Sequence, residues 1–357
     1  MAFDLQSFRD ESTAYDPFAD TPPPLPSGSF LFDYVTGVGG LPRGRIIEAF
    51  GKESSGKSTI FYQAIAAAQA EGGVGLILDY ENSFVRSYGE ACGMDVDPAK
   101  LLVDVPDSLE SGFNLANEVT RKAGEASIPL VVLFDSLEAM PLEAENAEED
   151  PNANNMVGAW RAKALGSRLR QSTGIIAKAG ALWVLINHEK DVIHTGFVTP
   201  GQRALAGSTR TPGGRAPKYY ASIRLQFTPT SKVKGNTVDP VTGEAVSDAV
   251  IAQKVRVTTV KNKLGAPNRS VVLTIRYGSG VDNAFDLVDV GLKRGVLARK
   301  SASSPIEVPG PDGTVVHTAR SLQGAVDYLS THEDVAEHIE SVLRDAIEHD
   351  AKGITDE

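Results

Sequence analysis

Residues 51–59 read GKESSGKST, and this stretch decides the fold because it contains the pattern Gly-x-x-x-x-Gly-Lys-Ser. The apolar run GRIIEAF precedes it and predicts a strand. The alanine-rich run KSTIFYQAIAAAQA follows and predicts a helix that stops at Gly72-Gly73. A glycine-rich turn between a strand and a helix points backbone N–H groups and the helix N-terminus at bound phosphate. The stretch therefore predicts a nucleotide-binding P-loop in an α/β protein.

Each residue type in the loop has a physical reason to be there. Gly51 and Gly56 let the backbone curve around the phosphates, Lys57 would reach the β- and γ-phosphates, and the Ser58 hydroxyl would hold Mg²⁺. We therefore expect ATP and Mg²⁺ as cofactors. The nucleotide-binding residues expected from the loop are Gly51, Glu53, Ser54, Ser55, Gly56, Lys57, Ser58 and Thr59.

Two acidic residues at predicted strand ends complete a hydrolytic site. Asp135 follows the apolar run LVVLF, which is the form of a Walker B strand. It would hold the Mg²⁺ together with Ser58, and the aspartate would contact the ion through water. Glu81 ends LILDYE and is the candidate base for the attacking water. Taken alone, either acid could instead be a solvated residue that caps a strand end.

Composition and targeting signals narrow the class of protein. The 357 residues have the balance of a globular protein, without a long apolar run or a secretory leader at the start of the sequence. Cys92 is the single cysteine, so an internal disulfide is excluded. We expect a cytoplasmic protein that has no membrane partner.

The charge distribution is uneven, although the net charge is −11. Residues 327–357 hold ten acidic residues against Arg344 and Lys352, so this end carries most of the negative charge. Residues 151–188 and 192–238 contain no acid and several lysines and arginines. Basic segments of this kind suit a nucleic acid backbone, although a solvated basic face is the simpler alternative.

The order of the predicted elements suggests three parts: an arm or linker over residues 1–27, an α/β core over 28–288 and a small C-terminal domain over 289–357. Strands and helices alternate through the core, and two fully apolar strands indicate a parallel sheet covered on both faces. Later β-rich runs at 220–227, 250–260 and 269–277 would extend the sheet. Residues 316–350 have helical spacing.

Several segments, in matching order, resemble the signature segments of the bacterial RecA recombinases and their phage-encoded relatives. They are LPRGRIIEAFGKESSGKST, LILDYENSF, VVLFDS, TPGGRAPKYYASIRL and VTTVKNKLGAPNRS. The resemblance implies a P-loop NTPase with a RecA-like core, whose mixed, mostly parallel sheet is flanked by helices, plus a small α+β C-terminal domain. It further implies a filament on single-stranded DNA that hydrolyses ATP to ADP and phosphate and catalyses homologous pairing and strand exchange.

The same resemblance assigns roles in the nucleotide site. It implies that Glu81 is the catalytic glutamate and Asp135 the Walker B aspartate. Tyr88, in RSYGE, matches an aromatic residue that stacks on adenine, and Tyr277, in IRYGSG, matches a second residue near the nucleotide.

Other matched positions concern communication between chains. Lys261 and Lys263, in VKNK, match two lysines that reach across a protomer interface to the phosphates, so hydrolysis would require assembly. His188 stands where bacterial members have a glutamine that senses the γ-phosphate, and phage members also have histidine there. Val85 replaces an aspartate near the adenine edge, which removes a hydrogen-bond acceptor.

The DNA-binding candidates come from two segments. MVGAWRAKALGSRLR resembles the family's first DNA loop and the helix after it, and residues 189–215 would form the second loop. Contacts to the DNA backbone would be independent of sequence, as homologous pairing requires. The candidates are Met156, Arg161, Arg168, Arg203, Arg210, Gly213, Gly214 and Arg215.

The implied partners are single-stranded and double-stranded DNA and further copies of the chain, with a single-stranded-DNA-binding protein or a loader as an additional candidate. Two other functions stay open from the residues: a ring-forming motor of the same core fold, such as a replicative helicase, and an ATP-gated protein that coats single-stranded DNA with little turnover. The acidic end would act either as a regulatory tail near DNA or as a solubilising helix surface.

Overall fold

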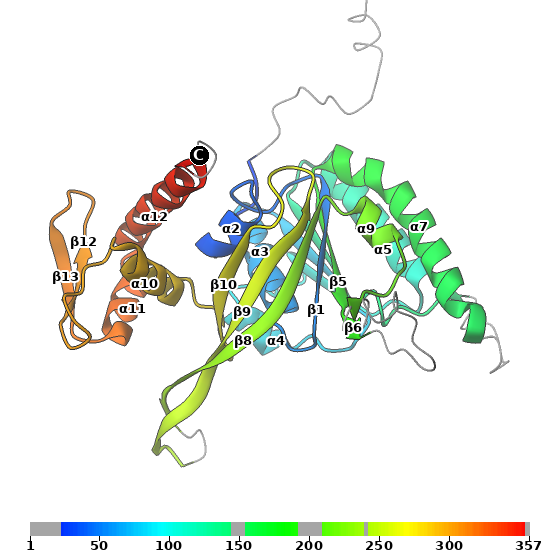
Figure 1. The fold of residues 1–357 in the computed structure, drawn as a ribbon. Coiled ribbons are helices and arrows are strands. Elements are labelled where there is room, and N and C mark those ends of the chain that lie inside the picture. Colours follow the sequence, from blue (N-terminus) through cyan, green and yellow to red (C-terminus); the bar gives the residue numbers. More distant parts are fainter. Residues whose placement is uncertain (1–22, 144–153, 192–208, 239–241, 354–357) are drawn as a thin grey trace, which may run out of the picture.

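The computed structural model describes residues 23–143, 154–191, 209–238 and 242–353 (Figure 1). Most of the expected N-terminal arm and the candidate Arg203 lie outside these ranges. Among the residues that the structure describes, every helix is too short or too polar to span a bilayer.

A nine-stranded sheet organises the described chain, in the order β11-β10-β9-β8-β1-β5-β4-β2-β3. The strands from β8 through β1 to β3 run parallel, whereas β8 to β11 pair antiparallel. This mixed, mostly parallel sheet confirms the predicted fold class. The strands are β1 Arg45–Gly51, β2 Val74–Asp79, β3 Leu101–Asp104, β4 Leu130–Asp135, β5 Leu182–His188, β8 Ile223–Val238, β9 Ala245–Asn262, β10 Ser270–Arg276 and β11 Gly280–Val281.

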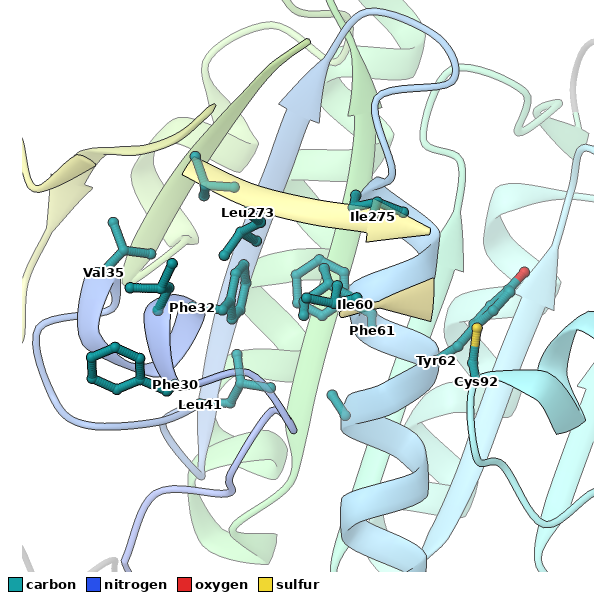
Figure 2. Packing of buried hydrophobic residues seen from close by; sticks show 14 of the residues in the cluster. Phe30, Phe32, Val35, Leu41, Ile60, Phe61, Tyr62, Cys92, Leu273 and Ile275 are labelled. Carbon is teal, nitrogen blue, oxygen red and sulfur yellow. The ribbon is translucent and has the colours of Figure 1, made fainter. Parts of the chain in front are cut away.

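Helices cover both faces of the sheet (Figure 1), and two apolar clusters fill the space between. Figure 2 shows part of the first cluster. On one face, Phe32 and Phe61 pack edge to face with ring centroids 5.9 Å apart. On the other, Phe113, Phe134 and Trp183 form a buried aromatic group. The helices of the core are α2 Phe30–Val35, α3 Lys57–Ala70, α4 Arg86–Ala91, α5 Leu109–Glu125, α7 Asn154–Ala179 and α9 Ala216–Tyr220.

Local sequence explains where the principal helices begin. Helix α3 starts directly after Gly56, whose φ of 79° lies in the left-handed region that glycine tolerates best. Helix α5 begins at a capping box in which the Ser108 and Ser111 side chains each accept a hydrogen bond from the other residue's backbone N–H. Ser108 is therefore the N-cap of α5.

The β8–β9 pair extends well beyond the sheet as a long hairpin (Figure 1). The predicted strands at 220–227 and 250–260 cover only the inner half of this hairpin. Past Phe227 most side chains of β8 are exposed, so its outer half lacks the apolar alternation that marks a half-buried strand. Two further short strands, β6 Lys190–Asp191 and β7 Thr209–Arg210, pair with each other.

The C-terminal part contains a two-stranded sheet and helices, and the helices pack into the apolar cluster that contains Phe32 and Phe61. Its elements are α10 Asn283–Arg294, β12 Ile306–Pro309, β13 Val315–Ala319, α11 Leu322–Thr331 and α12 Glu333–Gly353. The helical prediction for residues 316–350 is wrong at its start, because 316–319 belong to β13, which pairs antiparallel with β12. The expected boundary between residues 288 and 289 falls within α10, and the three-part division stays a proposal.

Candidate functional site

The candidate site lies where the carboxyl ends of four adjacent parallel strands, β1, β5, β4 and β2, meet at one edge of the sheet. Such an edge is where open α/β sheets bind ligands. A cavity of about 310 Å³ opens there. It is lined by Glu53, Ser54, Ser55, Gly56, Lys57, Ser58, Thr59, Glu81, Ser83, Asp135, Ile186 and His188.

Close approach of the backbone explains both glycines of the loop. A Cβ atom on Gly51 would lie 2.2 Å from the carbonyl oxygen of Phe227 on the neighbouring β8. A Cβ atom on Gly56 would lie 2.1 Å from Cδ1 of Ile275 on β10, and the φ of 79° adds a conformational penalty. At these two glycines the loop therefore packs directly against β8 and β10, and a larger residue would clash.

Lys57 is buried at the start of α3, with 5% of its surface exposed. Its ammonium donates to the carbonyl oxygens of Lys52 at 2.8 Å and Gly51 at 3.3 Å, and to Ser55 Oγ at 3.4 Å. Burial lowers the pKa of Lys57, and the negative charges of Asp135 and Glu81 act in the opposite direction. A negatively charged ligand in the cavity would supply the counter-charge that this buried cation favours.

Asp135 and Ser58 form the pair that fits a divalent cation. The Ser58 hydroxyl donates to Asp135 Oδ2 at 2.6 Å. Burial, reinforced by Glu81 and Asp79, raises the pKa of Asp135 to about 6. A hydroxyl and a carboxylate that share one corner of the cavity are oxygen ligands of the kind Mg²⁺ prefers. The residues present therefore fit Mg²⁺, and the positive charge of the ion would favour the ionised form of Asp135.

Glu81 is held from two sides. His188 Nε2 lies 2.8 Å from Glu81 Oε1, and the Ser136 hydroxyl donates to the same oxygen. The hydrogen bond from His188 is the main cause that lowers the pKa of Glu81, and the same bond raises the pKa of His188. His188 Nδ1 is buried without a hydrogen-bond partner among the described residues. The carboxylate is thus ionised and restrained beside the cavity.

The candidate adenine residues lie outside the phosphate cavity. The Tyr88 hydroxyl is 2.8 Å from Thr59 Oγ1, so α4 is tied to the first turn of α3. Tyr277 is 51% exposed and follows β10, whose Ile275 packs against Gly56. Val85, at the N-cap of α4, is 55% exposed. Tyr88 is therefore held against the helix that follows the loop, and Tyr277 lies two residues beyond the strand residue that contacts Gly56.

Lys261 and Lys263 do not line the cavity of their own chain. They sit at the end of β9 and just beyond it, where Lys261 Nζ donates to main-chain carbonyls of α9 and the residue after it, and Lys263 Nζ to Tyr219 O. The structure therefore separates these two lysines from Lys57, Glu81 and Asp135. Contact with phosphates would have to involve another copy of the chain.

The DNA-binding candidates are only partly described. Arg161 and Arg168 lie on α7, where Arg161 Nη1 donates to Glu138 O at 3.0 Å and Arg168 Nη1 to Asn114 Oδ1 at 3.1 Å. Exposed Arg215 is the N-cap of α9, directly after two glycines with left-handed φ. Arg203 and the side chains of Met156 and Arg210 lie outside the described residues; the backbone of Met156 is in α7 and that of Arg210 in β7, and the two glycines are Gly213 and Gly214.

A buried polar network beside the cavity was missed by the sequence reasoning. Glu48, fully buried in β1, accepts from Arg224 Nε at 2.5 Å and from Asn187 Nδ2 at 3.1 Å. Asn187 Nδ2 also donates to Pro212 O at 3.0 Å, and its Oδ1 accepts from the backbone N–H of His188. The one available signal was the acid within the apolar run IIEAF, since a buried charge needs a partner.

The chain is similar to known proteins along most of its length. A family model described as the RecA N-terminal domain matches residues 21–282. Protein RecA of Borrelia hermsii is 33% identical over 326 residues, which cover 91% of this chain and 82% of that protein. Protein RecA of Lactobacillus delbrueckii subsp. bulgaricus is 32% identical over 330 residues, covering 92% and 80%, respectively.

A third relative shows the same extent of similarity. Protein RecA of Salinispora tropica is 33% identical over 319 residues, which cover 89% of this chain and 82% of that protein. The similarity spans both the nucleotide site and the C-terminal part, and the resemblance inferred from the motifs is confirmed. The chain belongs to the RecA family of recombinases.

Proposed function

We propose that this chain assembles on single-stranded DNA with ATP and Mg²⁺ and couples ATP hydrolysis to homologous pairing and strand exchange. The observation that carries the proposal is the cavity at the ends of β1, β5, β4 and β2. It gathers a buried lysine, a hydroxyl–carboxylate pair and a restrained glutamate within one space of about 310 Å³. Family membership supplies the DNA-related part of the proposal.

The residues of the loop would hold the nucleotide in a defined way. Lys57 would exchange its carbonyl partners, Gly51 O and Lys52 O, for phosphate oxygens, and backbone N–H groups at the start of α3 would face the same anion. Ser58 and Asp135 would hold Mg²⁺, which neutralises charge on the phosphates when bound. Tyr88 and Tyr277 would flank the base.

Glu81 would act as the general base. Its ionised carboxylate faces the cavity and is restrained by His188 and Ser136. We propose that His188 donates to the γ-phosphate when nucleotide binds and thereby gives up its contact with Glu81, which is then free to accept a proton from water. The sensor and the base would in this way be linked by a single hydrogen bond.

DNA contacts would come from the two segments that leave this edge of the sheet. Arg161 and Arg168 on α7, with Met156 at its start, would contribute to one surface, and Arg203, Arg210 and Arg215 to the second. Gly213 and Gly214 would provide the backbone freedom for ordering on DNA. All of these arginines would neutralise phosphates without reading bases.

The proposed function predicts that affinity for single-stranded DNA depends on nucleotide. With ATP or a non-hydrolysable analogue, the chain should bind an oligonucleotide more tightly than with ADP, form helical filaments and exchange strands between homologous duplexes. Fluorescence anisotropy, electron microscopy and a strand-exchange assay measure these three properties. Closed rings would favour the motor, and filaments without turnover or exchange would favour the coating protein; either result would refute the proposal.

The Glu81→Gln variant should bind ATP and DNA like the wild type but hydrolyse ATP about 10²- to 10⁴-fold more slowly, since only the base is removed. Phosphate release with saturating single-stranded DNA measures this rate. Glu90→Gln is a suitable control, because Glu90 lies on the surface and pairs only with Arg86 among the described residues. Unchanged DNA-stimulated hydrolysis in Glu81→Gln would show that another group is the base.

A mixing experiment tests whether Lys261 acts on the neighbour's nucleotide. Lys261→Met chains lack the lysine and Glu81→Gln chains lack the base, so each alone should be nearly inactive. In an equimolar mixture, about a quarter of the head-to-tail interfaces should join an intact Glu81 to an intact Lys261 and regain activity. If the mixture hydrolyses no faster than the sum of its parts, the lysine does not act across the interface.

The contact between His188 and Glu81 predicts a pH dependence. The raised pKa of His188 and the lowered pKa of Glu81 mean that the ion pair persists from above the carboxyl pKa up to the imidazolium pKa. Its stabilisation is lost as pH rises through the raised His188 value, or falls through the lowered Glu81 value. In Glu81→Gln, NMR titration should show a lower His188 pKa than in the wild type, with His317 as internal control. An unchanged His188 pKa would mean that the two side chains do not pair in solution.

A further inference from the structure

The feature that carries a further inference is the short helix α9, which links the end of the second candidate DNA segment to β8. It spans Ala216–Tyr220, with Arg215 as its N-cap, and ends before Ala221, whose backbone leaves the helical conformation. The last carbonyl groups of any helix lack intrahelical N–H partners and form its partially negative end. At this end of α9 the carbonyls accept hydrogen bonds from two lysine side chains, Lys261 at the end of β9 and Lys263 just beyond it.

Lys261 uses its whole hydrogen-bonding capacity on this segment. Its ammonium lies 2.5 Å from Lys218 O, 3.3 Å from Tyr219 O and 2.8 Å from Ala221 O. An ammonium has three donors and no acceptor, so three carbonyls saturate it. Lys263 Nζ adds a fourth bond, to Tyr219 O at 2.9 Å, and the Lys263 backbone N–H donates to Ser222 O.

The two lysine side chains also lie close to each other, since both donate to Tyr219 O. Burial lowers the pKa of Lys261, and the positive charges of Lys263 and Arg224 act in the same direction. Within the described ranges, neither lysine forms a salt bridge with a carboxylate. The carbonyls of α9 are therefore the groups that hold two like charges side by side.

The opposite end of the same segment is fixed as well. Asn187 Nδ2 donates to Pro212 O, ahead of the two glycines that lead into α9. The span from Pro212 to Ala221 is thus attached at its start to β5, next to His188, and at its end to β9. Its own helical bonds are few, because α9 has only five residues.

We propose that Lys261 and Lys263 are positioning residues in their own chain, which hold α9 and hence Arg215 in place before assembly. This inference rests on the proposed function only in treating Arg215 as a DNA contact. The same contacts affect how Lys261 could act on the nucleotide of a neighbouring chain. A Lys261 ammonium that is saturated by α9 must leave those carbonyls before it can bind a neighbour's phosphate, so phosphate capture and release of α9 are a single exchange.

Hydrogen exchange without nucleotide or DNA tests the holding role directly. The reporters are the amides of Tyr219, Ala221 and Ser222, which donate to Arg215 O, Pro217 O and Ile46 O. In Lys261→Met these amides should exchange roughly tenfold faster than in the wild type, since three hydrogen bonds to the segment are lost. Lys261→Arg keeps donors at this site and should restore most of the protection, and Lys263→Met should have the smaller effect.

Lys254→Met is the matched control. Lys254 lies on the same strand and pairs with Asp289, which keeps Lys293 as a second partner. This variant should leave the exchange of the α9 amides unchanged. Equal exchange rates in Lys261→Met and the wild type would overturn the proposal, whether or not the chain hydrolyses ATP.

A double-mutant cycle tests the positioning of Arg215. The probe is a fluorescent oligothymidylate at low salt without nucleotide. Arg215→Gln should weaken binding in the wild type and have at most half of that effect, as a ratio of dissociation constants, in Lys261→Met. Additive effects would show that Lys261 holds α9 without positioning the arginine, and would overturn that part of the proposal.

Discussion

The desolvation of two opposite charges, Lys57 and Asp135, at one edge of the sheet is the constraint on which the site depends. Lys57, Asp135 and Glu81 come from three different strand–loop junctions, yet they share a cavity of about 310 Å³. Lys57 and Asp135 are 5% and 4% exposed, and burial alone would shift both toward their neutral forms. Their mutual attraction opposes that shift. A triphosphate would add negative charge beside Lys57, and its magnesium ion would add positive charge beside Asp135.

The sequence identified these three residues because each carries a local signal. Lys57 lies in a fixed glycine spacing, and Asp135 and Glu81 end apolar runs. The contacts of these residues could not be predicted in the same way, because the local pattern of apolar residues predicts strands but not their order in the sheet. Glu81 and His188 are 107 residues apart, and Glu48 and Arg224 are 176 apart; both pairs meet only because β2, β4, β5, β1 and β8 are neighbours.

Exposure explains the remaining differences between expectation and structure. The outer half of the β8–β9 hairpin was missed because a two-stranded ribbon in solvent needs no apolar face, and residues 316–319 were assigned to a helix although they pair with β12. In both segments most side chains are exposed, so the sequence shows no apolar alternation and the strands are recognised by their backbone pairing. The positions of Lys261 and Lys263 were likewise visible in the sequence, whereas their attachment to main-chain carbonyls of α9 leaves no side-chain pattern to detect.

Two fixed points connect the nucleotide edge with the segment that carries Arg215. Asn187 joins the strand that ends in His188 to Pro212, and Lys261 joins the end of β9 to the last turn of α9. The first point belongs to the chain's own nucleotide site. The second would be released by the nucleotide of a neighbour, if Lys261 reaches it as proposed. A segment restrained in this way would respond fully only when its own site and the adjacent site are both occupied, and that requirement would make DNA binding depend on contiguous assembly rather than on single chains.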